Sequence, residues 1–226
     1  MSVNYNTSIV TNGLVLCLDA ANSKSYPGTG TTWTDLSGNQ NNGTLVNGPT
    51  YSNINNGTIV FDGTNDVVQC GTTIPPAGNM SIFAWVYLTS VNSEWNIIAT
   101  KWFGGNDFHW ALKSPTNNGA GLKQNLFTSS NSDVYGATVF FTNTWYYVGF
   151  TLTNGGALTF YQNGIVDSTV SPVSRQTAGS TLQIGDERTS IYGLIGRIPQ
   201  VSIYNRALTA SEINQNFNAL RGRYGI

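Results

Sequence analysis

Residues 145–170 read Trp145-Tyr-Tyr-Val-Gly-Phe-Thr-Leu-Thr153, Asn154-Gly-Gly156, Ala157-Leu-Thr-Phe-Tyr-Gln162, Asn163-Gly164 and Ile165-Val-Asp-Ser-Thr-Val170. Apolar residues alternate along the first run, with Tyr146, Val148 and Phe150 on one side, which is the period of a half-buried strand. Asn163-Gly164 suits a hairpin loop because both residues tolerate positive φ. The stretch therefore predicts a three-stranded antiparallel meander, an arrangement from which β-sandwiches are built.

Short runs with the same strand character occur along the whole chain, separated by turn residues. They span residues 14–18, 43–46, 59–61, 67–70, 80–89, 97–102, 108–113, 121–128, 181–185 and 193–204. Residues 80–89 are apolar on both faces, which predicts a central strand that is either covered on both sides or forms a concave floor with one side. Residues 121–128 are a weaker run, expected at an edge or rim. Pro199 lacks an amide proton and predicts a bulge or an edge within the last strand.

One helix is predicted near the end of the chain. Thr209-Ala-Ser-Glu212 is a capping box, and apolar residues follow at helical spacing up to Leu220. Gly222 suits the stop of this helix. We expect an N-terminal arm over residues 1–12 and a helix over 209–221. The whole chain, residues 1–226, is predicted to form one all-β domain, a two-sheet antiparallel jelly-roll sandwich with this short C-terminal helix.

The composition restricts the classes of partner. Charged residues make up 9% of the 226 residues and the net charge is −1, so electrostatic binding to nucleic acid is not expected. No apolar run reaches the length of a membrane span, so no membrane insertion is expected. Residues 1–11 lack the hydrophobic region of a signal peptide. Cys17 and Cys70 are predicted to be free buried thiols, with a disulfide as the less favoured alternative.

Several segments match a family pattern in order. They include Gly13-Leu-Val-Leu-Cys-Leu-Asp-Ala-Ala-Asn22, Phe61-Asp-Gly-Thr-Asn-Asp66, Val201-Ser-Ile-Tyr-Asn-Arg-Ala-Leu-Thr-Ala-Ser-Glu-Ile213 and Asn216-Phe-Asn-Ala-Leu-Arg-Gly-Arg-Tyr224. Nearly the whole chain resembles the laminin-G-like, concanavalin-A-like lectin/glucanase jelly roll. The passage over residues 201–224 is similar to the version found in tailed-phage structural proteins. The resemblance implies the fold more strongly than the function, because this fold hosts enzymes, lectins and scaffolds.

Catalytic groups are sparse. Glucanases of this superfamily carry carboxylates on alternate residues of one strand, where they can flank a glycosidic bond. The nearest acidic pairs here are Asp62 with Asp66, across a turn, and Asp186-Glu187, whose side chains point to opposite faces of a strand. His109 is the only histidine in the sequence, and no nucleophile elbow surrounds any serine. We therefore expect a protein that is not an enzyme.

A calcium site is a candidate at one turn. Asp62, Asn65 and Asp66 offer the oxygen ligands that calcium prefers, and Asp19 and Asp186 could lie near them. The alternative is turn chemistry, in which these side chains bond to their own backbone. No other cofactor is expected.

A glycan site is a second candidate. Exposed aromatic rings that stack on sugar faces, with amide and carboxylate groups around them, predict such a site on Trp95, Trp102, Asn106, Asp107 and Trp110. The alternative is that these tryptophans fill the core of the sandwich.

The favoured function is a non-enzymatic virion structural protein of a tailed phage, either a capsid decoration or a component of a head or tail fibre. The alternative is a lectin-like carbohydrate-binding module for host attachment. The first interpretation places the protein in the virion after assembly in the host cytoplasm. The expected partners are other virion proteins, further copies of the chain in a homo-oligomer, and a host-surface glycan.

Overall fold

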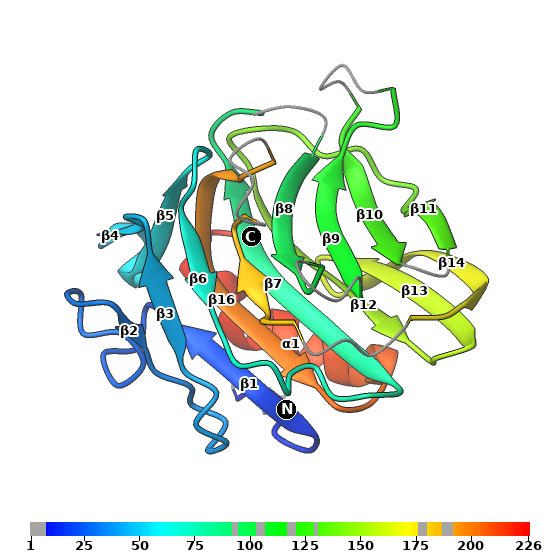
Figure 1. Cartoon of the computed structure of the whole chain (residues 1–226), viewed down its shortest axis with the longest axis horizontal. Helices are drawn as coiled ribbons and strands as arrows, with labels where there is room; N and C mark the ends of the chain where they lie inside the picture. The colour runs from blue at the N-terminus through cyan, green and yellow to red at the C-terminus, as the bar shows by residue number, and fades with distance from the viewer. Residues whose placement is uncertain are drawn as a thin grey trace, which may run out of the picture.

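Two antiparallel sheets lie face to face in the computed structural model of the chain (Figure 1). The structure describes residues 8–91, 95–102, 107–116, 121–128, 131–175, 180–186 and 192–226. In Figure 1 the strands β8, β9 and β10 of one sheet lie in front, and helix α1 lies behind the other sheet. This arrangement is the predicted two-sheet sandwich with one C-terminal helix.

Sheet A contains eight strands and carries the predicted meander at one edge. Its order is β14 (Ile165–Val173), β13 (Gly156–Gln162), β12 (Trp145–Leu152), β7 (Met80–Leu88), β16 (Ile195–Tyr204), β5 (Thr58–Asp62) and β4 (Thr50–Ser52), and β1 (Leu14–Asp19) also pairs with β16. The hairpin between β13 and β14 turns at Asn163 and Gly164, with φ angles of 50° and 79°. The meander and its hairpin are thus confirmed.

Sheet B also contains eight strands. Its order is β11 (Asn131–Tyr135), β10 (Lys123–Thr128), β9 (Phe108–Lys113), β8 (Trp95–Thr100), β15 (Gln183–Ile184), β6 (Val67–Gln69), β3 (Gly43–Val46) and β2 (Thr32–Trp33). Since β11 pairs with β10, residues 121–128 lie next to the edge strand and do not form the edge itself, which was one of the two predicted positions.

The strands β2, β4 and β11 were not predicted. The two-residue strand β2 and the three-residue strand β4 are too short for a period to be visible, and β11 is a run of mostly polar residues. The bulge at Pro199 is confirmed, because the register between β16 and β7 shifts between Arg197 and Gln200.

The main core lies between the sheets. Strand β7 contributes Ile82, Ala84 and Val86 to it, and every one of these side chains is buried. The opposite side of β7 carries Phe83 and Trp85, which belong to a second apolar cluster on the outer face of sheet A. The prediction of a central strand covered on both faces is confirmed.

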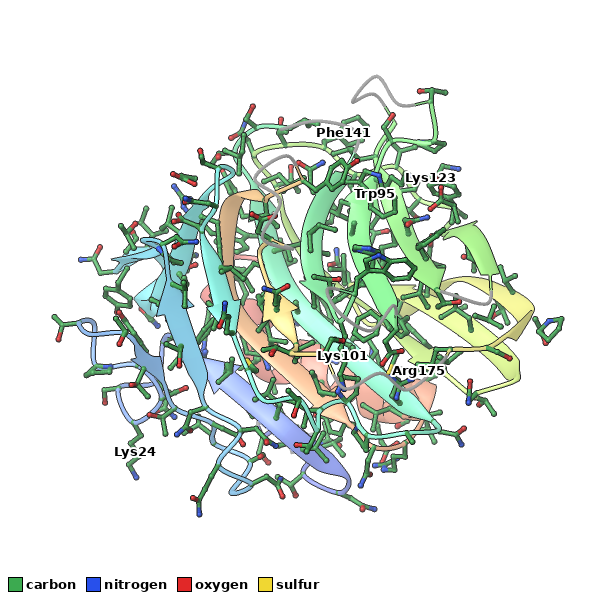
Figure 2. The ribbon with its side chains drawn as sticks, in the orientation of Figure 1. Lys24, Trp95, Lys101, Lys123, Phe141 and Arg175 are labelled. Atoms are coloured by element: carbon green, nitrogen blue, oxygen red, sulfur yellow. The ribbon has the colours of Figure 1, made fainter. Side chains whose placement is uncertain are left out.

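A buried ion pair joins the loops at one end of the sandwich. Arg175 donates to the Asp107 carboxylate at 2.7 Å, and both side chains are 0% exposed. Nearby Lys101 is also buried, and its ammonium donates to the Thr72 carbonyl at 2.7 Å. Figure 2 shows Lys101 and Arg175 at the lower end of sheet B as drawn. These contacts hold in place the backbone of loops that do not belong to either sheet.

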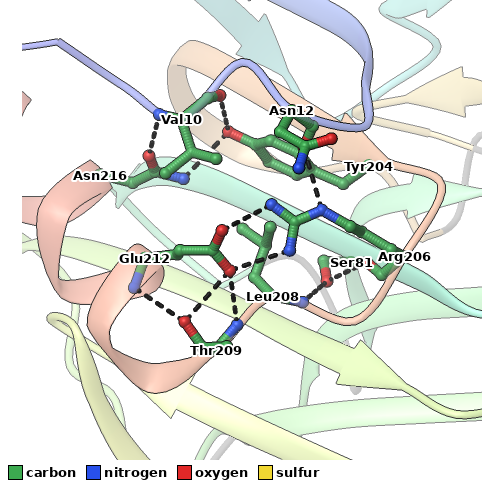
Figure 3. Close-up of polar contacts among 9 residues, drawn as sticks. All are labelled: Val10, Asn12, Ser81, Tyr204, Arg206, Leu208, Thr209, Glu212 and Asn216. Carbon is green, nitrogen blue, oxygen red and sulfur yellow. Dashed lines mark hydrogen bonds and ion pairs between the residues drawn. The ribbon is translucent and has the colours of Figure 1, made fainter.

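Helix α1 (Ala210–Leu220) begins as predicted. Thr209 accepts from the Glu212 amide, and the Glu212 carboxylate accepts from the Thr209 amide at 2.9 Å. Arg206 adds a bidentate ion pair to Glu212, with contacts of 2.9 and 2.6 Å (Figure 3). These hydrogen bonds lower the pKa of Glu212 to about 2. The helix ends at Leu220, where a 3-10 turn (Arg221–Arg223) containing Gly222 takes over.

The segment that precedes β1 ties this helix to sheet A. The Val10 amide donates to the Asn216 side chain at 2.8 Å, and Tyr204 donates to the Val10 carbonyl at 3.0 Å (Figure 3). Arg206 also donates to the Asn12 carbonyl at 3.1 Å. The end of the predicted N-terminal arm is therefore an ordered part of the fold, and residues 1–7 lie outside the described range.

Candidate functional site

The outer face of sheet B carries a cluster of aromatic rings, which we call the aromatic face and define as Trp95, Trp102, His109 and Phe127. The Trp102 ring centre lies 4.7 Å from that of His109 and 5.0 Å from that of Phe127. The Trp95 ring centre lies 5.6 Å from His109 and 6.4 Å from Phe127. Trp95, Trp102 and Phe127 are partly exposed, so part of each side chain reaches the surface.

Strand alternation explains why these rings gather on one face. On β9 the side chains of Phe108, Trp110 and Leu112 enter the main core. Successive residues of a strand point to opposite faces, so His109 and Lys113 stand on the outer side. Phe127 on β10 is paired with His109, which brings its ring to the same place.

Lys113 borders the aromatic face. Its ammonium lies 3.9 Å from the centre of the Trp95 ring, which is a cation–π distance. The same ammonium forms an ion pair with Asp133 on β11. Tyr135 donates to that carboxylate at 3.3 Å. The cation is therefore held in place and its charge is compensated within the protein.

His109 is a neutral member of the face. Burial, with a contribution from the Lys113 charge, lowers the pKa of His109 to about 4, against the opposing effect of Asp133. The Thr100 hydroxyl donates to the Phe108 carbonyl at 3.0 Å and lies 3.1 Å from His109 Nδ1. Since the hydroxyl has one proton, Nδ1 is the donor in the second contact, which leaves Nε2 as an acceptor.

The predicted glycan residues separate into different environments. Trp95 and Trp102 lie together on the aromatic face. Trp110 is 0% exposed in the main core, 5.6 Å from Phe150 between ring centres, so it cannot stack on a ligand. Asp107 is buried in its pair with Arg175 and is likewise unavailable. Asn106 lies outside the described residues.

Other residues of the surface were not predicted. Phe127, Lys113 and Tyr135 were overlooked, and His109 was considered only as a catalytic candidate. Inward and outward side chains alternate along residues 108–113 and again along residues 123–127. This alternation could have indicated which residues point away from the core. The pairing of these strands, which brings the residues together, is not visible in the sequence.

The predicted calcium residues lie in the turn after β5. The Asp62 carboxylate accepts from the Thr64 amide at 2.8 Å, and the Asp66 carboxylate accepts from the Asp62 amide at 3.0 Å. Asn65 offers its backbone carbonyl to Asn47 at 3.1 Å. Burial, together with the charges of Asp62 and Asp186, raises the pKa of Asp66 to about 6.

These contacts are hydrogen bonds to the backbone of the turn and its surroundings, which were the predicted alternative to a metal site. Asp19, which was expected to lie near the turn, instead pairs with Arg223 at 2.8 Å. Among the described residues no group of three acidic, histidine or cysteine side chains is arranged to hold a metal. Calcium binding at Asp62, Asn65 and Asp66 stays a prediction.

Within the described part of the chain, no helix has the length and apolar character needed to cross a membrane.

Cys17 and Cys70 are free and buried, and burial raises the pKa of each thiol to about 12. The prediction of two free buried thiols is confirmed.

The family model described as the concanavalin A-like lectin/glucanases superfamily matches residues 62–214. This match covers the meander, most of sheet B and the start of α1. Comparison with curated protein sequences gives no match.

Solved structures share the fold at low identity. The binding domain of Paraclostridial Mosquitocidal Protein 1 superposes with a TM-score of 0.69 and 18% identity, over 92% of this chain and 52% of that one. The botulinum neurotoxin serotype D/C binding domain gives 0.68 and 17%, over 93% and 53%. Domain 4 of AbnA, an extracellular arabinanase from Geobacillus stearothermophilus in complex with arabinotriose, gives 0.69 and 17%, over 90% and 97%. This chain thus spans about half of each toxin binding domain and nearly all of the arabinanase domain.

Proposed function

Because the chain belongs to the concanavalin A-like lectin/glucanases superfamily, we propose that it is a non-enzymatic glycan-binding domain whose ligand packs on the aromatic face of sheet B. The observation that carries the proposal is the grouping of Trp95, Trp102 and Phe127, all partly exposed, around the neutral ring of His109. Binding sites commonly combine aromatic surface with a few placed polar groups. Here the polar groups are His109, Lys113 and Asp133.

The environments of the carboxylates support glycan binding without hydrolysis. Glycoside hydrolysis in most families uses two carboxyl groups that flank the scissile bond. Asp133 is engaged with Lys113, and Asp107 is buried against Arg175. Neither of these two carboxylates is placed to act as a proton donor or nucleophile over the aromatic face.

The names of similar structures support the same class of function. The arabinanase domain was solved with arabinotriose, and the two toxin structures are described as binding domains. These ligands and roles belong to those proteins. For this chain we propose the broader class, a carbohydrate ligand.

The finer proposal is that this glycan-binding domain is a structural component of a tailed-phage virion, in a capsid decoration or in a head or tail fibre. It rests on the resemblance of residues 201–224 to tailed-phage structural proteins. Exposed apolar side chains on the edge strand β14, among them Ile165 and Val166, would suit contact with another virion protein. Detection of the chain in purified phage particles, by mass spectrometry and immunogold labelling, would test this placement. Particles without it would contradict the virion role and leave the glycan proposal standing.

Replacing Trp102 tests the glycan proposal. Trp102→Ala removes the ring whose centre lies 4.7 Å from that of His109 and 5.0 Å from that of Phe127, so we expect at least about a tenfold loss of affinity on a glycan array. Trp145→Ala is the matched control, because Trp145 is also partly exposed but lies against Tyr224 and Tyr87 on the outer face of sheet A, with its ring tilted to both. Equal binding by both variants and by the unmodified chain would contradict the proposal.

A further inference from the structure

A small cleft lies at one end of the sandwich, beside the start of β8. It has a volume of about 250 Å³ and is lined by uncharged residues, among them Val91, Leu122, Val139, Phe140 and Phe141. Phe141 is 67% exposed, and Val139 is 38% exposed. We call this cleft the rim pocket.

The backbone holds Phe141 outward. Its neighbour Phe140 is buried, with its ring centre 4.8 Å from that of Tyr146. The Phe140 amide donates to the Leu122 carbonyl at 2.7 Å, and the Phe141 amide donates to the Tyr146 hydroxyl at 3.3 Å. Because neighbouring residues of an extended segment point to opposite sides, anchoring Phe140 inward presents the Phe141 ring to solvent.

The rim pocket adjoins the aromatic face. Lys123 follows Leu122 and is paired with Lys113, whose ammonium lies over the Trp95 ring. Val91 is separated from Trp95 by a stretch of chain that spans at most ~14 Å when fully extended. Figure 2 shows Trp95 and Phe141 at the same upper end of the molecule. A ligand that covers Trp95 therefore needs to extend only a short way to reach Phe141.

We propose that the rim pocket is a second subsite for the same ligand, and that this ligand is an oligosaccharide whose chain runs from Trp95 over the rim to Phe141. This inference rests on the proposed function. An aromatic ring held at high exposure by an ordered backbone offers a flat apolar surface at little cost in conformational entropy, and such surfaces suit the faces of sugar rings.

Binding as a function of ligand length tests the proposal. The probes are linear arabino- and gluco-oligosaccharides of increasing length on an array, with Phe141→Ala compared with the unmodified chain. We expect affinity to rise with length in the unmodified chain, and Phe141→Ala to lose about tenfold on long ligands while keeping the affinity for short ones. Ile54→Ala is the matched control, because Ile54 is 44% exposed but lies in the 3-10 turn Ile54–Asn56, between β4 and β5.

The outcomes separate the two proposals. If Trp102→Ala abolishes binding and Phe141→Ala leaves the dependence on length unchanged, the rim subsite is wrong and the glycan function stands. If the unmodified chain binds no probe on the array, both proposals fail for this class of ligand. Loss of self-association in Phe141→Ala, with unchanged glycan binding, would show a contact between copies of the chain and would also overturn the rim subsite.

Discussion

His109 and Trp110 are neighbours on β9 with opposite environments. Trp110 fills the main core, whereas His109 lies on the outer face between Trp95 and Trp102. The outer position still buries most of the imidazole, which is 8% exposed. A titratable group in such a place makes the stability of the fold depend on pH.

We expect His109 to make the domain less stable in acid. Its pKa is lowered from 6.5 to about 4. At pH values between these two, the unfolded chain binds a proton that the folded chain does not bind. The free energy of unfolding should therefore fall by about 3 kcal/mol from this group as the pH drops through that window. Denaturant titrations of the unmodified chain and of His109→Gln at pH values above and below the window measure the difference. A stability difference between the two that does not change with pH would contradict this prediction.

Asp66 acts in the opposite direction and has to be separated from His109. Because its pKa is raised from 3.8 to about 6, the folded chain retains a proton that the unfolded chain loses, and stability falls as the pH rises through this range. The two effects overlap and partly cancel in the unmodified protein. Repeating the titrations in an Asp66→Asn background removes the opposing contribution and exposes that of His109.

At the scale of elements, the position of α1 decides which sheet face can bind a ligand. Ile213 and Leu220 of the helix pack with Phe83, Trp85 and Tyr147 on the outer face of sheet A. The aromatic face of sheet B is not covered by this helix, and its partly exposed rings are therefore open to other molecules. The helix thus covers the aromatic residues on the outer face of sheet A and leaves those on the outer face of sheet B accessible.

Phe217→Ala tests how strongly the helix is attached. The Phe217 ring centre lies 5.7 Å from that of Trp85 and 6.1 Å from that of Tyr147. Because Phe217 is only partly buried, we expect a loss near the lower end of the range for buried phenylalanines, about 3 kcal/mol. Chemical denaturation measures the change, and Asn214→Ala on the exposed side of the same helix is the control. An unchanged midpoint for Phe217→Ala would mean that the helix is peripheral.

At the scale of the whole molecule, low charge is combined with an apolar edge. Charged residues make up 9% of the sequence, so like-charge repulsion between copies is weak. The edge strand β14 exposes Ile165 and Val166, at 69% and 50%. Edge strands with exposed apolar residues are suited to pairing with another chain.

We expect this surface to support a homo-oligomer whose assembly persists from low to high salt, because screening weakens charged contacts and leaves apolar ones intact. Sedimentation velocity over a range of protein and salt concentrations measures the assembly state. Ile165→Lys should weaken the association by placing a charge on the edge of sheet A. A monomer at every concentration tested, or oligomers that dissociate as salt is added, would contradict this prediction.

The sequence by itself determined the features that depend on near neighbours in the chain. The alternation of Tyr146, Val148 and Phe150 specified a strand, Asn163-Gly164 specified a hairpin, and Thr209 with Glu212 specified the start of the helix. Each depends on a local period or on a few backbone hydrogen bonds, so residue types at short spacing are sufficient. The family pattern added the jelly-roll topology.

Only the tertiary structure decided which side chains share a surface. Trp95 and Trp102 were predicted as ligand residues, but so was Trp110, which faces the core because it lies one residue from His109 on an alternating strand. Phe127 joins the aromatic face through the pairing of β10 with β9. Strand pairing and the docking of α1 on sheet A are set by contacts between segments far apart in the chain. Local residue patterns do not specify such contacts, and for that reason the sequence predicted most of the longer strands but not the surface that they form.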